Sequence, residues 1–263
     1  MHEPFIGRAR LTAVKQRVRR TFCAIIFSIC ALSVAQTSHA QTAQVAKFNA
    51  ANGSLEASVT FETVGDLLYV HLENSSKNDS LVPRDLLTGV YFDIPGSPKL
   101  TPISAYLSDG SSMYHGIAPG GNVGGEWAFA SDLTGTLNDS HYGISTAGLG
   151  WFGGKNMFPG PNLDGKPGVG GMNYALLSAG DNPSTGNRAL KSTPLIMNGV
   201  DFVLKGMPEQ FTLDAISNLS VQYGTSTSEP RFTVPNDFVV PEPASLARFA
   251  IPLALITRRR RKA

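Results

Sequence analysis

The chain has 263 residues, which allows one large domain or two modest ones, and 42% of them are hydrophobic, which is enough to form a core. Only 16% are charged, below the roughly 25% of an average soluble domain. Basic residues gather at the two ends, whereas residues 41–240 hold 10 Lys and Arg against 18 Asp and Glu, a net charge of −8. The central region therefore lacks the basic surface of a nucleic-acid-binding protein.

Residues 1–40 have the order of parts found in a secretory signal peptide. Six basic residues within 1–20 precede an uncharged apolar run from Phe22 to Val34. Ser38 and Ala40 then place small residues three and one positions before a cleavage point, between Ala40 and Gln41. The apolar run has 13 residues, and a membrane-spanning helix needs about 20. We therefore expect cleavage rather than permanent anchoring.

Both cysteines of the chain, Cys23 and Cys30, lie in the predicted signal peptide. The mature chain is therefore expected to contain no cysteine, which excludes disulfides, thiol catalysis and cysteine-ligated zinc. A domain of about 200 residues does not need disulfides, because at that size it buries most of the surface of its unfolded chain.

Alternation of apolar and polar residues predicts a β-rich extracellular domain over residues 41–237. Each alternating stretch is typical of a strand with one buried face and one face in water. The clearest stretches are 55–62, 68–73, 90–94, 200–205 and 219–223, and weaker candidates are 100–107, 126–130, 174–178 and 211–215. Turn-rich links join them, and we find neither a long helical period nor an internal repeat. The predicted fold class is all-β: a single antiparallel sandwich or jelly-roll-like domain.

A glycine-rich segment from Gly143 to Gly171, with ten glycines in 29 residues, interrupts the strand pattern. Regular helix or strand carries an entropic cost for such a sequence, so we expect a long ordered loop. Its aromatic residues Trp151, Phe152 and Phe158 are expected to plug the core. The alternative is a ligand-binding surface, in which exposed rings of Trp127 or Trp151 stack on sugars.

Two glycine-rich motifs of nucleotide-binding proteins occur in this segment, and neither fits. Residues 148–153 spell G-x-G-x-x-G, but the glycines and prolines that follow prevent the helix whose N-terminus would face a pyrophosphate. Residues 160–166 approach a phosphate-binding loop, but Pro167 stands where a Ser or Thr has to bind magnesium.

The body's histidines, His71, His115 and His141, match no metal-binding or hydrolase spacing. We therefore predict no catalytic residue, no metal site and no cofactor. Structural calcium is left open, because loop aspartates can supply oxygen ligands: Asp109, Asp132, Asp139 and Asp164. A surface enzyme of the glycoside hydrolase type also stays open, because its two carboxylates meet in space rather than in sequence.

Residues 238–263 combine three parts. The first contains Val240, Pro241, Glu242 and Pro243, whose prolines favour an extended strand that an enzyme can bind. A short apolar segment follows, from Leu246 to Thr257. The last part is a basic cluster, which the positive-inside rule keeps in the cytoplasm: Arg258, Arg259, Arg260, Arg261 and Lys262. Because the basic N-terminus stays on the same side, the domain between them is expected outside.

This tail, together with the signal peptide, resembles the PEP-CTERM sorting signal of exosortase-dependent surface proteins of Gram-negative bacteria. The resemblance implies export by the secretion machinery, transient anchoring in the inner membrane by a transmembrane helix, and processing by exosortase, a membrane transpeptidase. The motif residues would then be recognised, not catalytic. We expect a non-enzymatic structural or interaction protein at the cell surface or in the exopolysaccharide matrix, with a carbohydrate-binding module as the alternative.

Overall fold

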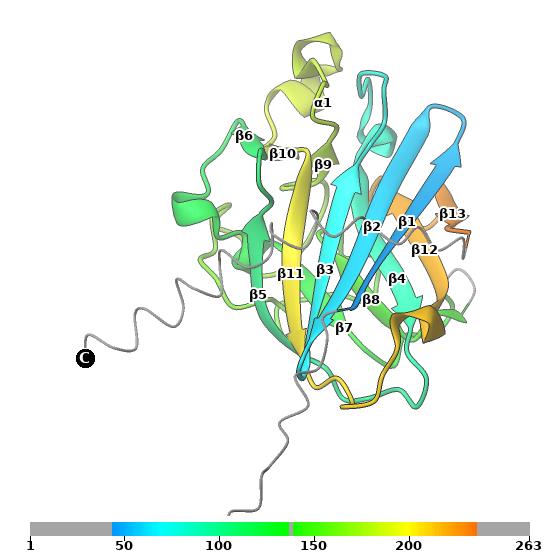
Figure 1. Ribbon diagram of the computed structural model, residues 1–263. Coiled ribbons are helices and arrows are strands. Elements are labelled where there is room, and N and C mark those ends of the chain that lie inside the picture. Colours follow the sequence, from blue (N-terminus) through cyan, green and yellow to red (C-terminus); the bar gives the residue numbers. More distant parts are fainter. Residues whose placement is uncertain (1–43, 137–138, 236–263) are drawn as a thin grey trace, which may run out of the picture. The chain divides into compact units, whose positions relative to one another are not determined.

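The computed structural model describes residues 44–136 and 139–235 (Figure 1). The predicted signal peptide with Ala40 and Gln41, the sorting motif from Val240 to Pro243, and the basic cluster from Arg258 to Lys262 lie outside the described residues. Within the described ranges, no helix is long and apolar enough to cross a membrane.

Five strands form the first sheet, and every neighbouring pair in it is antiparallel. Their order across the sheet is β1 (Gln44–Asn52), β2 (Leu55–Val64), β3 (Leu67–Asn74), β11 (Gly199–Lys205) and β5 (Thr101–Leu107). β11 thus lies between β3 and β5, although more than 90 residues separate it from either along the chain. This insertion brings side chains from distant parts of the sequence together.

The second sheet has eight strands. Six follow one path: β13 (Arg231–Thr233), β12 (Ser217–Tyr223), β4 (Leu87–Asp93), β9 (Leu176–Leu177), β10 (Leu195–Met197) and β6 (Ser112–Tyr114). β8 (Tyr142–Ser145) also pairs with β4, and β7 (Ala128–Ala130) pairs with β8. The pair of β9 and β10 is parallel and the other pairs are antiparallel, so this sheet is mixed.

Helical structure is confined to single turns among the described residues. Within 44–136 and 139–235, the one α-helix is α1 (Arg188–Lys191), and the 3₁₀ turns include η2 (Pro83–Asp85), η3 (Pro119–Gly121), η4 (Gly124–Glu126), η6 (Pro183–Thr185) and η7 (Leu213–Ala215). The asparagine side chain at position 187 caps α1 by accepting hydrogen bonds from two backbone N–H groups of its first turn.

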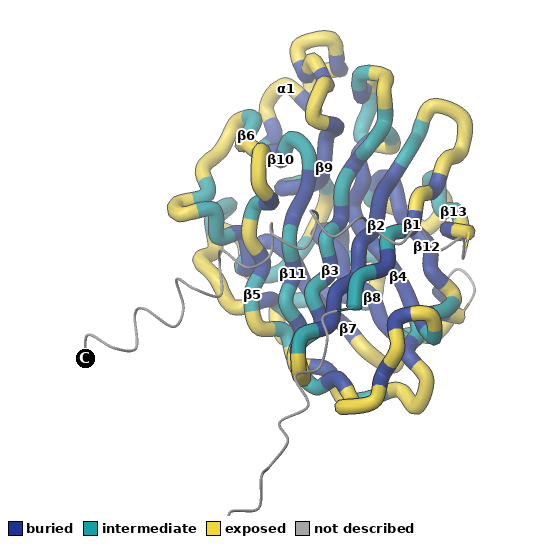
Figure 2. Tube along the Cα trace, viewed as in Figure 1, coloured by how far each residue is buried: buried dark blue, intermediate teal, exposed yellow. Residues whose placement is uncertain are grey.

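The two sheets pack face to face around one main core (Figure 2). Alternate residues of β2, β3 and β11 point inward toward alternate residues of β4 and β12. The ring of Phe61 on β2 meets that of Phe92 on β4 edge to face, with centroids 5.2 Å apart. Contacts of this kind add about 0.5–1.5 kcal/mol to the burial of their apolar area. The predicted all-β sandwich-like domain is confirmed.

The five clearest predicted strands are confirmed as β2, β3, β4, β11 and β12, and the weaker stretch 100–107 as β5. The prediction of a strand at 211–215 is wrong. This segment contains the 3₁₀ turn η7, in which Ala215 donates its backbone hydrogen bond to Thr212. Its alternating apolar residues face the core from a turn, so the period of two does not mark a strand there. β1 was missed, because two of its three inward residues are small alanines at positions 46 and 50.

The glycine-rich segment is an ordered cover held by close backbone contacts. Phe158 and Phe152 expose only 1% and 8% of their surface, which confirms the prediction that their rings are buried. The backbone of Gly125 lies very close to the glycine-rich segment: a Cβ atom at this position would be only 2.0 Å from the carbonyl oxygen of Pro161. The buried carboxylate of Glu126 accepts hydrogen bonds from two backbone N–H groups of the segment, at positions 163 and 164.

Candidate functional site

A polar network lies on the outer face of the first sheet, where β3, β11 and the end of β5 meet. In β3, Leu68, Val70 and Leu72 point into the core, so His71 points outward between them. Asp201 occupies the corresponding outward position of β11 and is the register partner of His71. The antiparallel pairing therefore sets the two side chains directly opposite each other.

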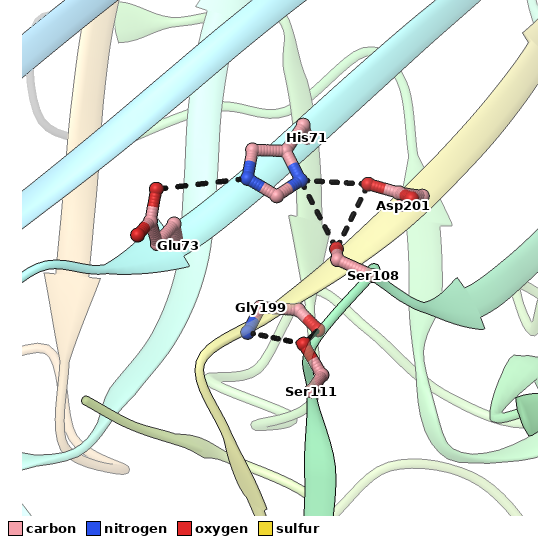
Figure 3. A network of polar contacts seen from close by, with 6 residues as sticks. All are labelled: His71, Glu73, Ser108, Ser111, Gly199 and Asp201. Carbon is pink, nitrogen blue, oxygen red and sulfur yellow. Dashed lines mark hydrogen bonds and ion pairs between the residues drawn. The ribbon is translucent and has the colours of Figure 1, made fainter. Parts of the chain in front are cut away.

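Two side chains, those of Asp201 and Ser108, converge on the Nδ1 side of the His71 ring (Figure 3). The Nδ1 atom lies 2.6 Å from Oδ1 of Asp201 and 3.0 Å from Oγ of Ser108. The Ser108 hydroxyl donates to the same carboxylate oxygen at 2.8 Å. On the other side of the ring, Nε2 forms an ion pair with Oε2 of Glu73 at 3.7 Å. Below the network, Ser111 exchanges two hydrogen bonds with the backbone of Gly199, which holds the turn between β5 and β6 against β11.

The two carboxylates decide the charge of the imidazole. Burial lowers the pKa of His71, but the hydrogen bond to Asp201, the interaction with Glu73 and the negative charges of both raise it more, to about 9. At neutral pH the ring is therefore a cation, and both of its nitrogens carry protons.

This connectivity differs from that of a serine hydrolase triad. In a triad, a neutral histidine accepts the serine proton on one ring nitrogen and is held by the aspartate through the other. Here Ser108 and Asp201 share Nδ1, the serine donates to the aspartate, and Nε2 faces Glu73. A protonated ring cannot take the serine proton, and the contacts join β3, β11 and the residue that follows β5.

A second perturbed carboxyl group lies on the outward side of β2. Glu62 is 4% exposed, and its Oε2 atom has no hydrogen-bond partner in the described part of the chain. Burial raises the pKa of Glu62 to about 7. This group therefore changes its charge close to physiological pH.

A polar hollow of about 530 Å³ lies where the turn between β1 and β2 meets the loop that follows β3. Asp79 and Asp85 line it, but both carboxylates already accept hydrogen bonds, Asp79 from the loop at positions 182 and 185 and Asp85 from backbone N–H groups of its own loop. Across the described ranges, no group of three or more His, Cys, Asp and Glu residues is arranged to hold a metal. The hollow is not lined by any of the four loop aspartates for which structural calcium was left open, Asp109, Asp132, Asp139 and Asp164.

The two tryptophans have different environments. Trp127 is fully buried and packs edge to face on Phe202, with ring centroids 5.0 Å apart. The prediction that Trp127 could stack on a sugar is therefore wrong, because its neighbours in the core already cover the ring. Trp151 is only half-buried and packs against Tyr91 on the outer face of the second sheet, beside the guanidinium group of Arg231.

No family model matches this chain, and neither does any curated protein or solved structure.

The sequence predicted only part of the polar network. His71 and Asp201 were recognised as polar positions of predicted strands, but nothing in their spacing indicated that β3 and β11 are neighbours. Ser108 and Arg231 carried no sequence signal.

Proposed function

We propose that this chain is an exported protein of the PEP-CTERM type, whose β-sandwich has a structural or interaction role at the cell surface or in the exopolysaccharide matrix. The order of segments around the sandwich carries this proposal. The described fold spans 44–235. The expected cleavage between Ala40 and Gln41 comes just before it, and the motif from Val240 to Pro243 follows it.

The chemistry of the sandwich supports a role without catalysis. The grouping that most resembles a hydrolase, His71 with Ser108 and Asp201, has the connectivity of an ion-pair cluster. The carboxylates that line the polar hollow are engaged by backbone and hydroxyl groups. An acidic body without cysteines also suits a hydrated polymer outside the cell.

Mass spectrometry of the mature protein from an exosortase-containing host tests the processing. We expect a chain that begins at Gln41 and lacks the cluster from Arg258 to Lys262. Replacing Glu242 by Gln should leave the tail in place, whereas Glu209→Gln, at an exposed body position, should be processed normally. Intact tail peptides on the secreted wild-type protein would overturn the proposal.

A topology reporter tests the export step independently. The exposed turn at Asp109 and Gly110, between β5 and β6, can accept an inserted reporter without breaking a strand. Reporter activity outside the cytoplasm is the expected result. Activity in the cytosol would contradict a surface role.

Carbohydrate binding is the second candidate function, and the partial exposure of Trp151 favours it. A half-buried tryptophan can offer one ring face to a sugar while its other side is held by the protein. Loss of glycan binding on Trp151→Ala, with Trp127 unchanged, is the expected result for this role.

A further inference from the structure

The first sheet ends on one side in β1, a long and regular edge strand. β1 has nine residues and lies at the margin of the sheet, with β2 as its one partner strand in the described part of the chain (Figure 1). Its register with β2 runs without a bulge from Gln44 to Asn52, and it contains no proline. An edge strand of this kind is a template on which another strand can pair.

The other sheet edges within 44–136 and 139–235 are shortened, distorted or covered. At the opposite edge of the first sheet, β5 contains Pro102 and a register shift against β11, and its Ala105 carbonyl accepts a hydrogen bond from a neighbouring loop. In the second sheet, β6 and β13 have three residues each, and the glycine-rich segment bonds to the open side of β7 through Phe129. Such features prevent strands of separate molecules from pairing. β1 has only one of them, the charge of Lys47.

Alternate residues of β1 direct their backbone groups to the open side of the sheet. Ala51 opposes Glu56 in the register, but the N–H and C=O groups of Glu56 bond to positions 76 and 75, which follow β3. Ala51 and Glu56 are therefore a non-hydrogen-bonded pair, and the backbone groups of Ala51 point away from β2. The same holds for every second residue before it, Val45, Lys47 and Asn49. No backbone hydrogen bond between described residues reaches these four positions from outside β1 and β2.

These four residues are complementary to the same four residues of a second, antiparallel β1. In one register Asn49 faces Lys47 of the second copy and Val45 faces Ala51 of the second copy, and the two reverse pairs follow from the two-fold symmetry. Each pair then exchanges two hydrogen bonds. The register also keeps the core-facing side chains of both copies on one face of the joined sheet.

Charge selects this register among the alternatives. Lys47 is the one charged residue of β1. A shift by two residues in one direction sets Lys47 opposite Lys47 of the second copy, which is unfavourable, and a shift in the other direction leaves one of the four pairs unmade. The net charge of −8 over residues 41–240 repels two copies at long range, but salt screens this repulsion. No acidic side chain of β1 meets another at the edge, because β1 contains none.

We propose that the open edge of β1 binds β1 of a second copy of this chain, antiparallel and with Asn49 opposite Lys47. The two five-stranded sheets then join into one continuous sheet. This pairing goes beyond the role proposed above and does not depend on export. Only its use in a matrix, where paired domains bind a repetitive polymer with higher avidity, rests on that role.

The oligomeric state of the purified full chain tests the pairing. Sedimentation velocity between about 1 and 500 µM should show a reversible equilibrium between monomer and dimer. Hydrogen exchange followed by NMR then identifies the interface. The amides at positions 45, 47, 49 and 51 should become protected as the dimer forms, whereas those at 46 and 50, which bond to β2, should be protected at every concentration. A failed sorting experiment would leave both results unaffected.

Opposite charges at one exposed position test the register. Asn49→Glu sets a carboxylate opposite Lys47 of the second copy, twice in each dimer, so the dissociation constant should fall by about threefold to tenfold. Asn49→Lys should raise it by a similar factor, and both effects should shrink at about 1 M salt. Ser112→Glu and Ser112→Lys, at an exposed position of the edge strand β6, should leave the equilibrium unchanged.

Four results would overturn the proposal. A wild type that stays monomeric up to about 500 µM would show that the edge does not pair with itself. A weaker dimer with both Glu and Lys at position 49 would show that this residue faces its own copy, in another register. A dimer that responds to neither variant would place the interface elsewhere. Protection of the amides at 45, 47, 49 and 51 in the monomer would show that another segment of the same chain covers the edge.

Discussion

Deprotonation of His71 at alkaline pH should destabilise the fold, because its pKa is higher in the folded than in the unfolded chain. The folded value of about 9 against a model value of 6.5 means that the folded state holds the proton more tightly over this interval. The stabilisation is fully present below about pH 6.5 and is lost as the pH rises through about 9.

The size of the effect follows from the shift and from the exposure of the pair. The change from 6.5 to about 9 corresponds to about 3 kcal/mol. The side chains of His71 and Asp201 are 20% and 34% exposed, so solvent screening reduces this to about 2 kcal/mol. For a domain of this size, such a loss lowers Tm by about 4–8 °C.

Urea unfolding at pH 6 and at pH 9.5 measures this loss, with His71→Gln as the comparison. The free energy of unfolding of the wild type should fall by about 2 kcal/mol more than that of the variant. His115→Asn, at an exposed turn position outside the network, should behave like the wild type. Equal pH dependence in the wild type and His71→Gln would refute the reasoning, because it would mean that the imidazole titrates alike in both states.

Glu62 acts in the adjoining pH window, which is why the comparison has to be made between variants. Its pKa is raised from 4.5 to about 7, so the folded state favours the protonated carboxyl group. The stabilisation from Glu62 is present below about pH 4.5 and disappears as the pH rises through about 7. This contribution is common to the wild type and to His71→Gln, and it cancels in their difference.

Substitutions at four further positions test the packing of the glycine-rich segment and the core. Glu126→Ala should lower the free energy of unfolding by about 2 kcal/mol, because two backbone N–H groups of the segment lose their acceptor; Glu126→Gln should recover most of this in the same urea titration. Gly125→Ala should cost about 1–3 kcal/mol, because its Cβ would overlap the carbonyl oxygen of Pro161, and an unchanged Tm would argue against that contact. Trp127→Ala should cost about 3–5 kcal/mol in thermal unfolding and Trp151→Ala clearly less, since only Trp127 is fully buried.

Local sequence patterns predicted the strands wherever branched or large apolar residues alternate with polar ones. In β3, Leu68, Val70 and Leu72 alternate with polar or amphipathic residues, and this pattern occurs only if one face is buried. The same reasoning failed for 211–215, because a 3₁₀ turn can also present apolar residues to the core. It failed for β1, because alanine is only weakly apolar. The burial of Phe158 was predictable from its ring, but that of Trp127 depended on where Phe202 lies.

The sequence by itself determined that the body is an all-β sandwich, because the alternation of side chains along a strand is a local property of the chain. It could not determine which strands become neighbours. His71 and Asp201 are 130 positions apart, and they meet because β11 inserts between β3 and β5. Arg231 meets Tyr91 and Trp151 for the same reason, through the pairing of β13 with β12 and of β12 with β4. Charge, hydrogen bonding and pKa depend on distances of a few ångströms, and only the packing of the whole chain sets those distances.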